Sequence, residues 1–303
     1  MRPARVTARV IAPFTVLALL AAAQPVLADD LTVGAGARYA TISAALEAAR
    51  PGDRVLVRAG TYREPTLVIR TPRLTLEGQG WPVLDGQGER EVLVIAADDV
   101  TVRGIVATNT GTSNLEDRAG IRAREVRNCL IEHNRLRDNL WGIYLQRSAD
   151  CVVRNNDIEA HGERQAASGN GIHLWYSPGA RVEHNRVRGH RDGIYFEFSS
   201  HGMTRGNVSE RSQRYGLHFM FSDSCAYLEN TFRDNASGVA VMYSRGVVIT
   251  RNRFERSWGS AAYGLLLKAI SGGEITDNVF ERNSTGLFVE GSSRLAFRGN
   301  TFS

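Results

Sequence analysis

The chain has 303 residues, 43% of them apolar, and this length is compatible with one large domain or two ordinary ones. Its net charge of +5 overstates its basicity, because three of the 37 basic residues, Arg2, Arg5 and Arg9, lie in an N-terminal leader and the remaining 34 nearly balance 32 acidic ones. This balance, with the arginines scattered along the chain, argues against a nucleic-acid-binding protein.

Residues 1–28 have the pattern of a secretory signal peptide. The three arginines precede an apolar run over residues 11–23, and residues 26–28 offer small side chains for cleavage before Asp29. A membrane anchor is the alternative, but a run of roughly 13 apolar residues is shorter than the ~20 that cross a bilayer. We therefore expect an exported protein with a cleaved leader.

Residues 29–65 are predicted to form an N-terminal cap and a first coil. The segment 41–50 has the pattern of a short amphipathic helix that ends at Pro51 and Gly52, and a strand over 54–57 follows. A solenoid needs such a cap, because an open first coil exposes strand edges and apolar core to water. Residues 66–303 are predicted to form the solenoid itself, with less regular coils up to residue 110.

A repeat of about 22 residues dominates the chain from residue 120 onward. Glycine followed by an aliphatic residue recurs at intervals of 22, 29, 22, 23, 22, 26 and 22, and an asparagine stands fourteen residues after each glycine. All variation in length therefore falls after the asparagine, where a tolerant loop is expected. The glycines are Gly120, Gly142, Gly171, Gly193, Gly216, Gly238, Gly264 and Gly286, and the asparagines are Asn134, Asn156, Asn185, Asn207, Asn230, Asn252, Asn278 and Asn300.

Each unit contains three short apolar stretches, which predicts an all-β, right-handed parallel β-helix. Apolar side chains one and three residues after the glycine, such as Ile143 and Leu145, have the period of a strand. A leucine-rich repeat would have a helical half, and a propeller blade would need ~40 residues. The asparagines are expected to adopt a left-handed turn and to stack their amides from coil to coil. The sequence stops within the eighth unit without a cap, and we expect a truncated chain.

Residues two and four after each glycine are expected to face outward and to form an exposed strip that contacts a partner or ligand. The first outward column is Arg122, Tyr144, His173, Tyr195, His218, Ala240, Leu266 and Phe288; the second is Arg124, Gln146, Trp175, Glu197, Met220, Met242, Lys268 and Glu290. We assign Trp175, Tyr195, Glu197 and Tyr243 to partner binding.

Met220 and Met242 occupy neighbouring coils of the second column, about 4.8 Å apart, and His218 lies two residues from Met220. Thioether and imidazole groups suit a soft ion such as Cu(I). The candidate metal ligands are therefore His218, Met220, Met242 and His173, against the simpler interpretation of surface or packing residues. His201 and Met203 lie beyond a turn and are weaker candidates.

The three cysteines, Cys129, Cys151 and Cys225, fall in one inward column and are expected to be buried and unbridged, because stacked parallel side chains are awkward for a disulfide.

An enzymatic role is tested by the carboxylates of the outward columns. Glycoside hydrolysis needs two carboxylates about 5 to 9.5 Å apart. Glu197 and Glu290 are four coils apart, at roughly 19 Å, so no catalytic residue is assigned and the protein is expected not to be an enzyme. A carbohydrate-active β-helix enzyme and a solenoid that only docks other proteins remain as alternatives.

Four segments carry a family resemblance: Gly-Ile-His-Leu-Trp at 171–175, Gly-His-Arg-Asp-Gly-Ile-Tyr-Phe-Glu-Phe at 189–198, Tyr-Gly-Leu-His-Phe-Met-Phe-Ser at 215–222 and Gly-Val-Ala-Val-Met-Tyr-Ser at 238–244. Through them residues 29–303 resemble the NosD family, periplasmic β-helix proteins needed to mature nitrous oxide reductase. The resemblance implies a non-enzymatic periplasmic accessory in denitrification. Its partners would be an ABC transporter of the NosF and NosY type and a NosL-type copper chaperone, and its task would be transient Cu(I) delivery to the copper-sulfur centre of nitrous oxide reductase.

Overall fold

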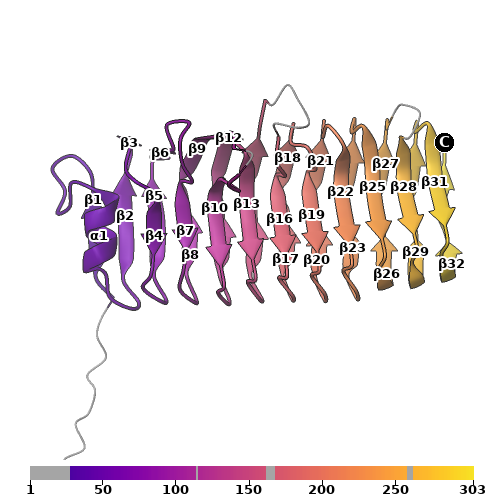
Figure 1. The fold of residues 1–303 in the computed structure, drawn as a ribbon, viewed down its shortest axis with the longest axis horizontal. Helices are drawn as coiled ribbons and strands as arrows, with labels where there is room; N and C mark the ends of the chain where they lie inside the picture. Colours follow the sequence, from indigo (N-terminus) through magenta and orange to yellow (C-terminus); the bar gives the residue numbers. More distant parts are fainter. Residues whose placement is uncertain (1–27, 114, 162–167, 258–261) are drawn as a thin grey trace, which may run out of the picture.

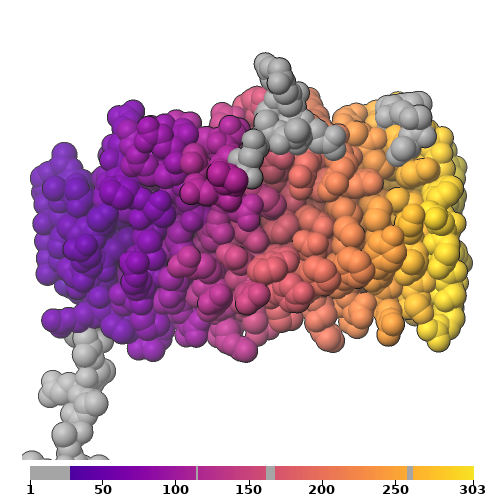
Figure 2. Space-filling model, viewed as in Figure 1, coloured from indigo at the N-terminus to yellow at the C-terminus, as the bar shows by residue number. Residues whose placement is uncertain are grey.

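A computed structural model describes residues 28–113, 115–161, 168–257 and 262–303, so the predicted leader lies almost entirely outside the described residues. The described chain winds into coils that stand side by side in one row, from the N-terminal end to the C-terminal end (Figure 1). In a space-filling view the coils form a single elongated rod (Figure 2). The predicted parallel β-helix is confirmed.

Three parallel sheets run the length of the rod, and within the described residues they hold 12, 11 and 10 strands. Sheet A consists of β1 (Asp30–Val33), β2 (Arg54–Arg58), β5 (Thr75–Gln79), β8 (Thr101–Arg103), β11 (Leu130–Glu132), β14 (Val152–Arg154), β17 (Arg181–Glu183), β20 (Met203–Arg205), β23 (Ala226–Leu228), β26 (Arg245–Thr250), β29 (Ser271–Thr276) and β32 (Ser293–Arg298).

Sheet B consists of β3 (Thr61–Tyr62), β6 (Val83–Asp85), β9 (Val106–Gly111), β12 (Arg135–Asn139), β15 (Asp157–Glu159), β18 (Arg186–Arg188), β21 (Val208–Glu210), β24 (Thr231–Arg233), β27 (Arg253–Glu255), β30 (Val279–Glu281) and β33 (Thr301–Phe302). Sheet C consists of β4 (Leu67–Ile69), β7 (Leu93–Ile95), β10 (Ala119–Arg124), β13 (Trp141–Gln146), β16 (Ile172–Trp175), β19 (Ile194–Glu197), β22 (Tyr215–Met220), β25 (Ser237–Met242), β28 (Tyr263–Lys268) and β31 (Thr285–Glu290).

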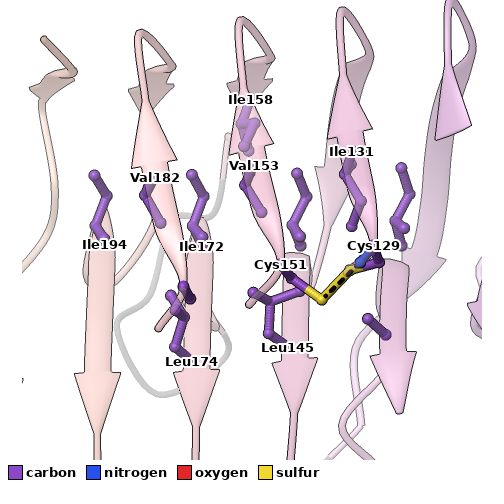
Figure 3. Close-up of a cluster of buried hydrophobic side chains, with 14 of the residues drawn as sticks. Cys129, Ile131, Leu145, Cys151, Val153, Ile158, Ile172, Leu174, Val182 and Ile194 are labelled. Atoms are coloured by element: carbon purple, nitrogen blue, oxygen red, sulfur yellow. Dashed lines mark hydrogen bonds between the residues drawn. A yellow bond between two sulfur atoms is a disulfide. The ribbon is translucent and has the colours of Figure 1, made fainter. Parts of the chain in front are cut away.

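The core is a column of apolar side chains enclosed by the three sheets. Ile143 pairs in register with Ile172, and Leu145 pairs with Leu174, and all four side chains are fully buried. Figure 3 shows Leu145, Ile172 and Leu174 among the buried side chains of neighbouring coils. The positions one and three residues after each repeat glycine are thus inward, as the alternation predicts.

The asparagine column forms the predicted ladder of side-chain amides. Asn156 is representative: its amide donates to Asn185 Oδ1 at 3.0 Å and to the carbonyl of Ile131 at 2.9 Å, and its Oδ1 accepts from the backbone and side chain of Asn134. The expectation of left-handed backbone at the asparagines is wrong. The positive φ falls one residue earlier, for example at Asn155, while the asparagine turns its amide inward.

The repeat glycines mark places where neighbouring coils approach closely. A Cβ added at Gly142 would lie 2.4 Å from the backbone oxygen of Gly171 on the next coil, which is closer than real Cβ contacts. This steric need explains why glycine recurs at the entry to the strands of sheet C.

The N-terminal end is covered by α1 (Ile42–Ala48), which begins after the capping residue Thr41. The Thr41 side chain accepts from the backbone N–H of Ala44, and Glu64 accepts from the N–H groups of Ile42 and Ser43. Ile42 and Ala45 point into the core. The first turn of the helix is therefore held by side chains, as the isolated helix is too short to be stable alone.

One cysteine expectation is wrong: Cys129 and Cys151 form a disulfide (Figure 3). In-register pairing of β11 with β14 brings their Cα atoms to 4.6 Å, within the range that a disulfide spans. Cys225 is unbridged and buried, and burial raises the pKa of its thiol to about 12.

On sheet A, the charged side chains Glu132, Arg154, Glu183 and Arg205 alternate in sign from coil to coil, and a similar alternation surrounds Glu210 on sheet B. Glu210 on β21 receives hydrogen bonds from Arg186 on the preceding coil and from Arg233 on the following one. In-register stacking would otherwise place like charges opposite each other, which destabilises a sheet. Within the described ranges, no helix is long and apolar enough to span a bilayer.

Candidate functional site

The outward columns of sheet C have the register that the repeat predicts. His173 pairs with Tyr195 and Tyr195 with His218, while Met220 pairs with Met242 on the next coil. Met220 and Met242 are thus neighbours in the second outward column, one strand spacing of about 4.8 Å apart.

From Tyr144 to Leu266 the first outward column is buried, contrary to expectation, whereas Phe288 at its end is exposed. His173, Tyr195 and His218 retain only 4%, 8% and 4% of their accessible surface. Side chains that precede the glycines fold over them: Asn170 Nδ2 lies 2.9 Å from His173 Nδ1, and Arg214 Nη2 lies 3.2 Å from His218 Nδ1. The alternation along a strand correctly gives the side of the sheet that each histidine faces. The side chains of Asn170 and Arg214 then shield the histidines from water.

The aromatic rings of the first column contact one another in the order Tyr144, His173, Tyr195, His218, with centroids 4.5 to 4.9 Å apart. The first two contacts are edge to face, and the rings of Tyr195 and His218 are stacked. Tyr195 therefore separates the two histidines, which are two strand spacings, about 10 Å, apart. The structure does not bring His173 into one cluster with the other candidate ligands. Burial, and secondarily the charge of Arg191, lowers the pKa of His173 to about 3, so its imidazole is neutral at physiological pH.

His218 belongs to a buried network with Asp192 and Arg214. The Arg214 guanidinium forms two hydrogen bonds with the carboxylate of Asp192, whose side chain is completely inaccessible. The same carboxylate lies 3.4 Å from His218 Nδ1 and accepts from the backbone N–H of Tyr215. Burial alone would raise the pKa of Asp192, but the hydrogen bonds with Arg214 and His218 outweigh it and lower the pKa to about 2.

Among the residues that the structure describes, the remaining ring nitrogen of His218 has no hydrogen-bond partner. This atom, Nε2, is buried. Nδ1 faces Asp192 and Arg214, both of which precede β22, so Nε2 lies on the part of the ring that points away from them. Tyr195 contacts both residues: its ring stacks on His218 at 4.5 Å, and its hydroxyl donates to Met220 Sδ at 3.4 Å.

This donor set fits a soft cation better than a hard one. Two thioethers and one imidazole nitrogen are available, whereas the described residues hold no group of three or more His, Cys, Asp or Glu side chains arranged around a metal position. Sulfur and imidazole ligands favour Cu(I), while Mg²⁺ and Ca²⁺ need oxygen ligands.

A row of exposed aromatic side chains lies beside the second column, at the first residue after each strand. We call it the aromatic strip; it consists of Tyr176, Phe198, Phe221 and Tyr243, which are 38 to 46% exposed. Successive rings stack with centroids 4.8 to 5.1 Å apart. All four residues have positive φ, between 48° and 54°, which is uncommon for bulky residues.

Sequence reasoning missed this strip apart from Tyr243. The signal was present, since the strip is the column five residues after the repeat glycines, but this position lies just beyond the strand and so outside the alternation that predicts outward residues. Of the other residues assigned to partner binding, Trp175 and Glu197 are half-buried beside the strip, and Tyr195 is buried. Trp175 contacts Tyr176 edge to face at 4.9 Å, and Arg147 lies over the Trp175 ring.

The two acids of the second column remain far apart. Glu197 and Glu290 are separated by β22, β25 and β28, hence by four strand spacings or about 19 Å. This distance exceeds the separation of paired carboxylates in glycosidases.

Three parallel sheets joined coil by coil define the class of this molecule: it is a parallel β-helix protein. The model of a right-handed β-helix region matches residues 85–187, and the model described as periplasmic copper-binding protein (NosD) matches residues 159–303. A probable ABC transporter binding protein NosD from Stutzerimonas stutzeri is 36% identical over 239 residues, 77% of this chain and 53% of that protein. The chain is a NosD-type protein, and it spans about half the length of this curated relative.

Solved structures share the fold across unrelated activities. The A-module of the Azotobacter vinelandii mannuronan C-5 epimerase AlgE4 has a TM-score of 0.59 at 15% identity, covering 83% of this chain and 87% of that one. The Streptococcus pneumoniae surface adhesin PfbA has a TM-score of 0.60 at 11% identity, covering 86% of each chain. An enzyme and an adhesin resemble this solenoid equally, so the likeness concerns the fold alone.

Proposed function

We propose that this chain is a periplasmic accessory protein that delivers copper, as transient Cu(I), for assembly of the copper-sulfur centre of nitrous oxide reductase. The observation that carries the proposal is the pairing of Met220 with Met242 beside His218, whose buried Nε2 has no partner in the described chain. The description of the matching family as periplasmic and copper-binding supports the same role, as does the predicted leader at 1–28.

In this role the protein carries copper as its cargo and has to bind it reversibly. A donor protein must bind Cu(I) strongly enough to accept it and weakly enough to release it. Two thioethers and one imidazole give a soft, largely uncharged ligand set without thiolates, which supports reversible binding. Cys225 does not compete, because its thiol is buried and its pKa is raised to about 12.

The role requires partners: an ABC transporter of the NosF and NosY type, a NosL-type copper chaperone and nitrous oxide reductase. The name of the Stutzerimonas relative supports the transporter. We assign docking to the aromatic strip together with Trp175 and Glu197, because exposed aromatic side chains are typical of interface centres. Tyr195 is buried and contributes from beneath this surface.

A carbohydrate-active enzyme is the competing proposal, and a purely docking solenoid is a third. The wide separation of Glu197 and Glu290 counts against the enzyme. The presence of two stacked methionines next to a histidine favours a metal-binding role over docking alone.

The decisive experiment is an anaerobic Cu(I) titration of the mature protein against a competing chelator. Stoichiometric binding is expected for the wild type, and its loss is expected in the triple variant His218→Ala, Met220→Ala, Met242→Ala. The double variant His201→Ala, Met203→Ala removes a histidine and a methionine on sheet A and its turn, and should bind as the wild type does. If the wild type does not bind Cu(I), or if the triple variant still binds it, these three residues do not form a copper site.

A further inference from the structure

We propose that Asp192 is a positioning residue for His218: it accepts the Nδ1–H of the imidazole and thereby directs the lone pair of Nε2 toward the Met220 and Met242 column. This inference rests on the proposed function for its ligand, a soft cation, but its geometry is independent of that proposal. The alternative is that Arg214 donates to Nδ1, which would leave a hydrogen on Nε2.

Both candidates lie close to the ring. Asp192 Oδ2 is 3.4 Å from His218 Nδ1, and Arg214 Nη2 is 3.2 Å from it. An arginine nitrogen can only donate, so a hydrogen bond from Arg214 requires a lone pair on Nδ1, whereas a hydrogen bond to Asp192 requires a hydrogen there. The two contacts therefore demand opposite tautomers of a neutral imidazole.

The environment of Nε2 decides between the tautomers. This atom is buried and has no hydrogen-bond partner among the described residues. A buried N–H without an acceptor is rarer in proteins than an under-used acceptor, because the donor loses its only hydrogen bond to water. The tautomer with hydrogen on Nδ1 thus has the lower free energy.

Hydrogen bonds hold the carboxylate of Asp192 in a position where it can accept from His218 Nδ1. Arg214 Nε and Nη2 both donate to Asp192, and the backbone N–H of Tyr215 donates to Oδ1 at 3.2 Å. These contacts hold the carboxylate of Asp192 in place, while the Tyr195 ring stacks on the imidazole at 4.5 Å. Histidine ligands of protein metal sites are commonly oriented by a carboxylate on the other ring nitrogen.

The first test needs no metal. In the metal-free protein labelled with ¹⁵N-histidine, long-range ¹H–¹⁵N spectra should show His218 with a protonated Nδ1 and an unprotonated Nε2, and the signals are assigned by their loss in His218→Gln. In Arg214→Leu the Nδ1–H tautomer should persist, because the carboxylate remains. A hydrogen on Nε2 in the wild-type protein would overturn the inference.

The second test uses Cu(I) alone as the probe. Asp192→Asn should weaken Cu(I) binding about 10- to 100-fold, the usual effect of losing a carboxylate behind a histidine ligand. Glu210→Gln is the matched control, because Glu210 is also a buried carboxylate paired with arginines but is on sheet B, and it should bind Cu(I) as the wild type does. Thermal melting establishes that each variant is folded.

The outcomes separate the two proposals. Wild-type protein that binds no Cu(I) contradicts the proposed function and leaves the tautomer measurement to decide the role of Asp192. Wild-type protein that binds Cu(I), with folded Asp192→Asn binding equally well, contradicts the positioning role alone. If Asp192→Asn does not fold, the tautomers of the wild type and of Arg214→Leu still decide the question.

Discussion

The hydroxyl of Tyr195 donates a hydrogen bond to the sulfur of Met220 at 3.4 Å, across neighbouring coils. This contact occupies one lone pair of the thioether that we propose as a copper ligand. It also ties the second outward column to the ring stack of the first, since the same tyrosine lies against His218.

Replacing Tyr195 by phenylalanine should strengthen Cu(I) binding. The variant keeps the ring stack and frees the Met220 sulfur from a hydrogen bond of about 1 kcal/mol, which corresponds to roughly a fivefold higher affinity. Competition titration measures the change. Tyr144→Phe is the control, because Tyr144 lies in the same stack but next to Trp141 and His173. An unchanged affinity in Tyr195→Phe would mean that Cu(I) does not displace the hydrogen bond between Tyr195 and Met220 Sδ.

Replacing Asn156 by alanine should destabilise the fold strongly. The change removes four hydrogen bonds of the amide ladder and leaves buried partners on both neighbouring coils, at a cost of about 1–3 kcal/mol for each group left unsatisfied. Urea unfolding measures the loss. Asn155→Gly alters the adjacent exposed residue with positive φ and should stay within about 1 kcal/mol of the wild type. Equal stability of both variants would contradict a structural ladder.

The cysteines should be countable by thiol titration. Protein unfolded without reductant should expose one thiol, Cys225, and unfolded, reduced protein should expose three. Native protein should react slowly, because the remaining thiol is buried with a pKa near 12. The double variant Cys129→Ser, Cys151→Ser should lose about 3 kcal/mol of stability, as expected for a loop of this length. Three reactive thiols without reductant would rule out the disulfide.

Stability should fall as the pH drops from about 7.5 to 5. Burial lowers the pKa of His190 to about 4, below its ordinary value of 6.5. The unfolded chain therefore binds a proton in this range that the native state does not bind, which costs about 2 kcal/mol at pH 5. Urea unfolding of His190→Gln should show a shallower pH dependence than the wild type. An identical slope in both proteins would mean that the native state accommodates the charged imidazole.

The aromatic strip should be dispensable for folding and necessary for docking. The variant Phe198→Asn, Phe221→Asn loses stacking but places a residue that tolerates positive φ, so its melting temperature should change little. Its affinity for the purified transporter complex should fall at least tenfold, measured by surface binding kinetics. Trp81→Asn is the control: Trp81 is also exposed with positive φ but lies far from the strip. Equal binding by both variants would place docking elsewhere.

The strands and their register could be predicted from the sequence because they depend on spacing alone. Gly142, Ile143 and Leu145 repeat in the next coil as Gly171, Ile172 and Leu174, and a period of two identifies their faces. The amide ladder followed from the constant distance between glycine and asparagine. These features are local or recur once per coil, so a single sequence is enough to predict them.

The environment of the candidate site could not be predicted in the same way. The burial of His218 depends on how Arg214 and Asp192 fold back over it, and these residues lie outside the strand pattern. The positive φ of Phe198 and Phe221 is unusual for aromatic residues and is held by serines one residue later, whose hydroxyls accept backbone hydrogen bonds from the preceding coil. Side-chain contacts across coils determined both features.

The stacking of similar coils gives the rod a constant rise per coil. Each coil advances the axis by one strand spacing of about 4.8 Å, so the separation between β4 and β22, the strand of the same sheet that holds Met220, is a whole number of such steps. Adding or removing one coil would translate the candidate site along the axis without altering its internal geometry, because each coil contacts mainly its two neighbours. The position of the candidate site along the rod is therefore set by the number of repeats. The ligand that the site binds is set by a few side chains within them.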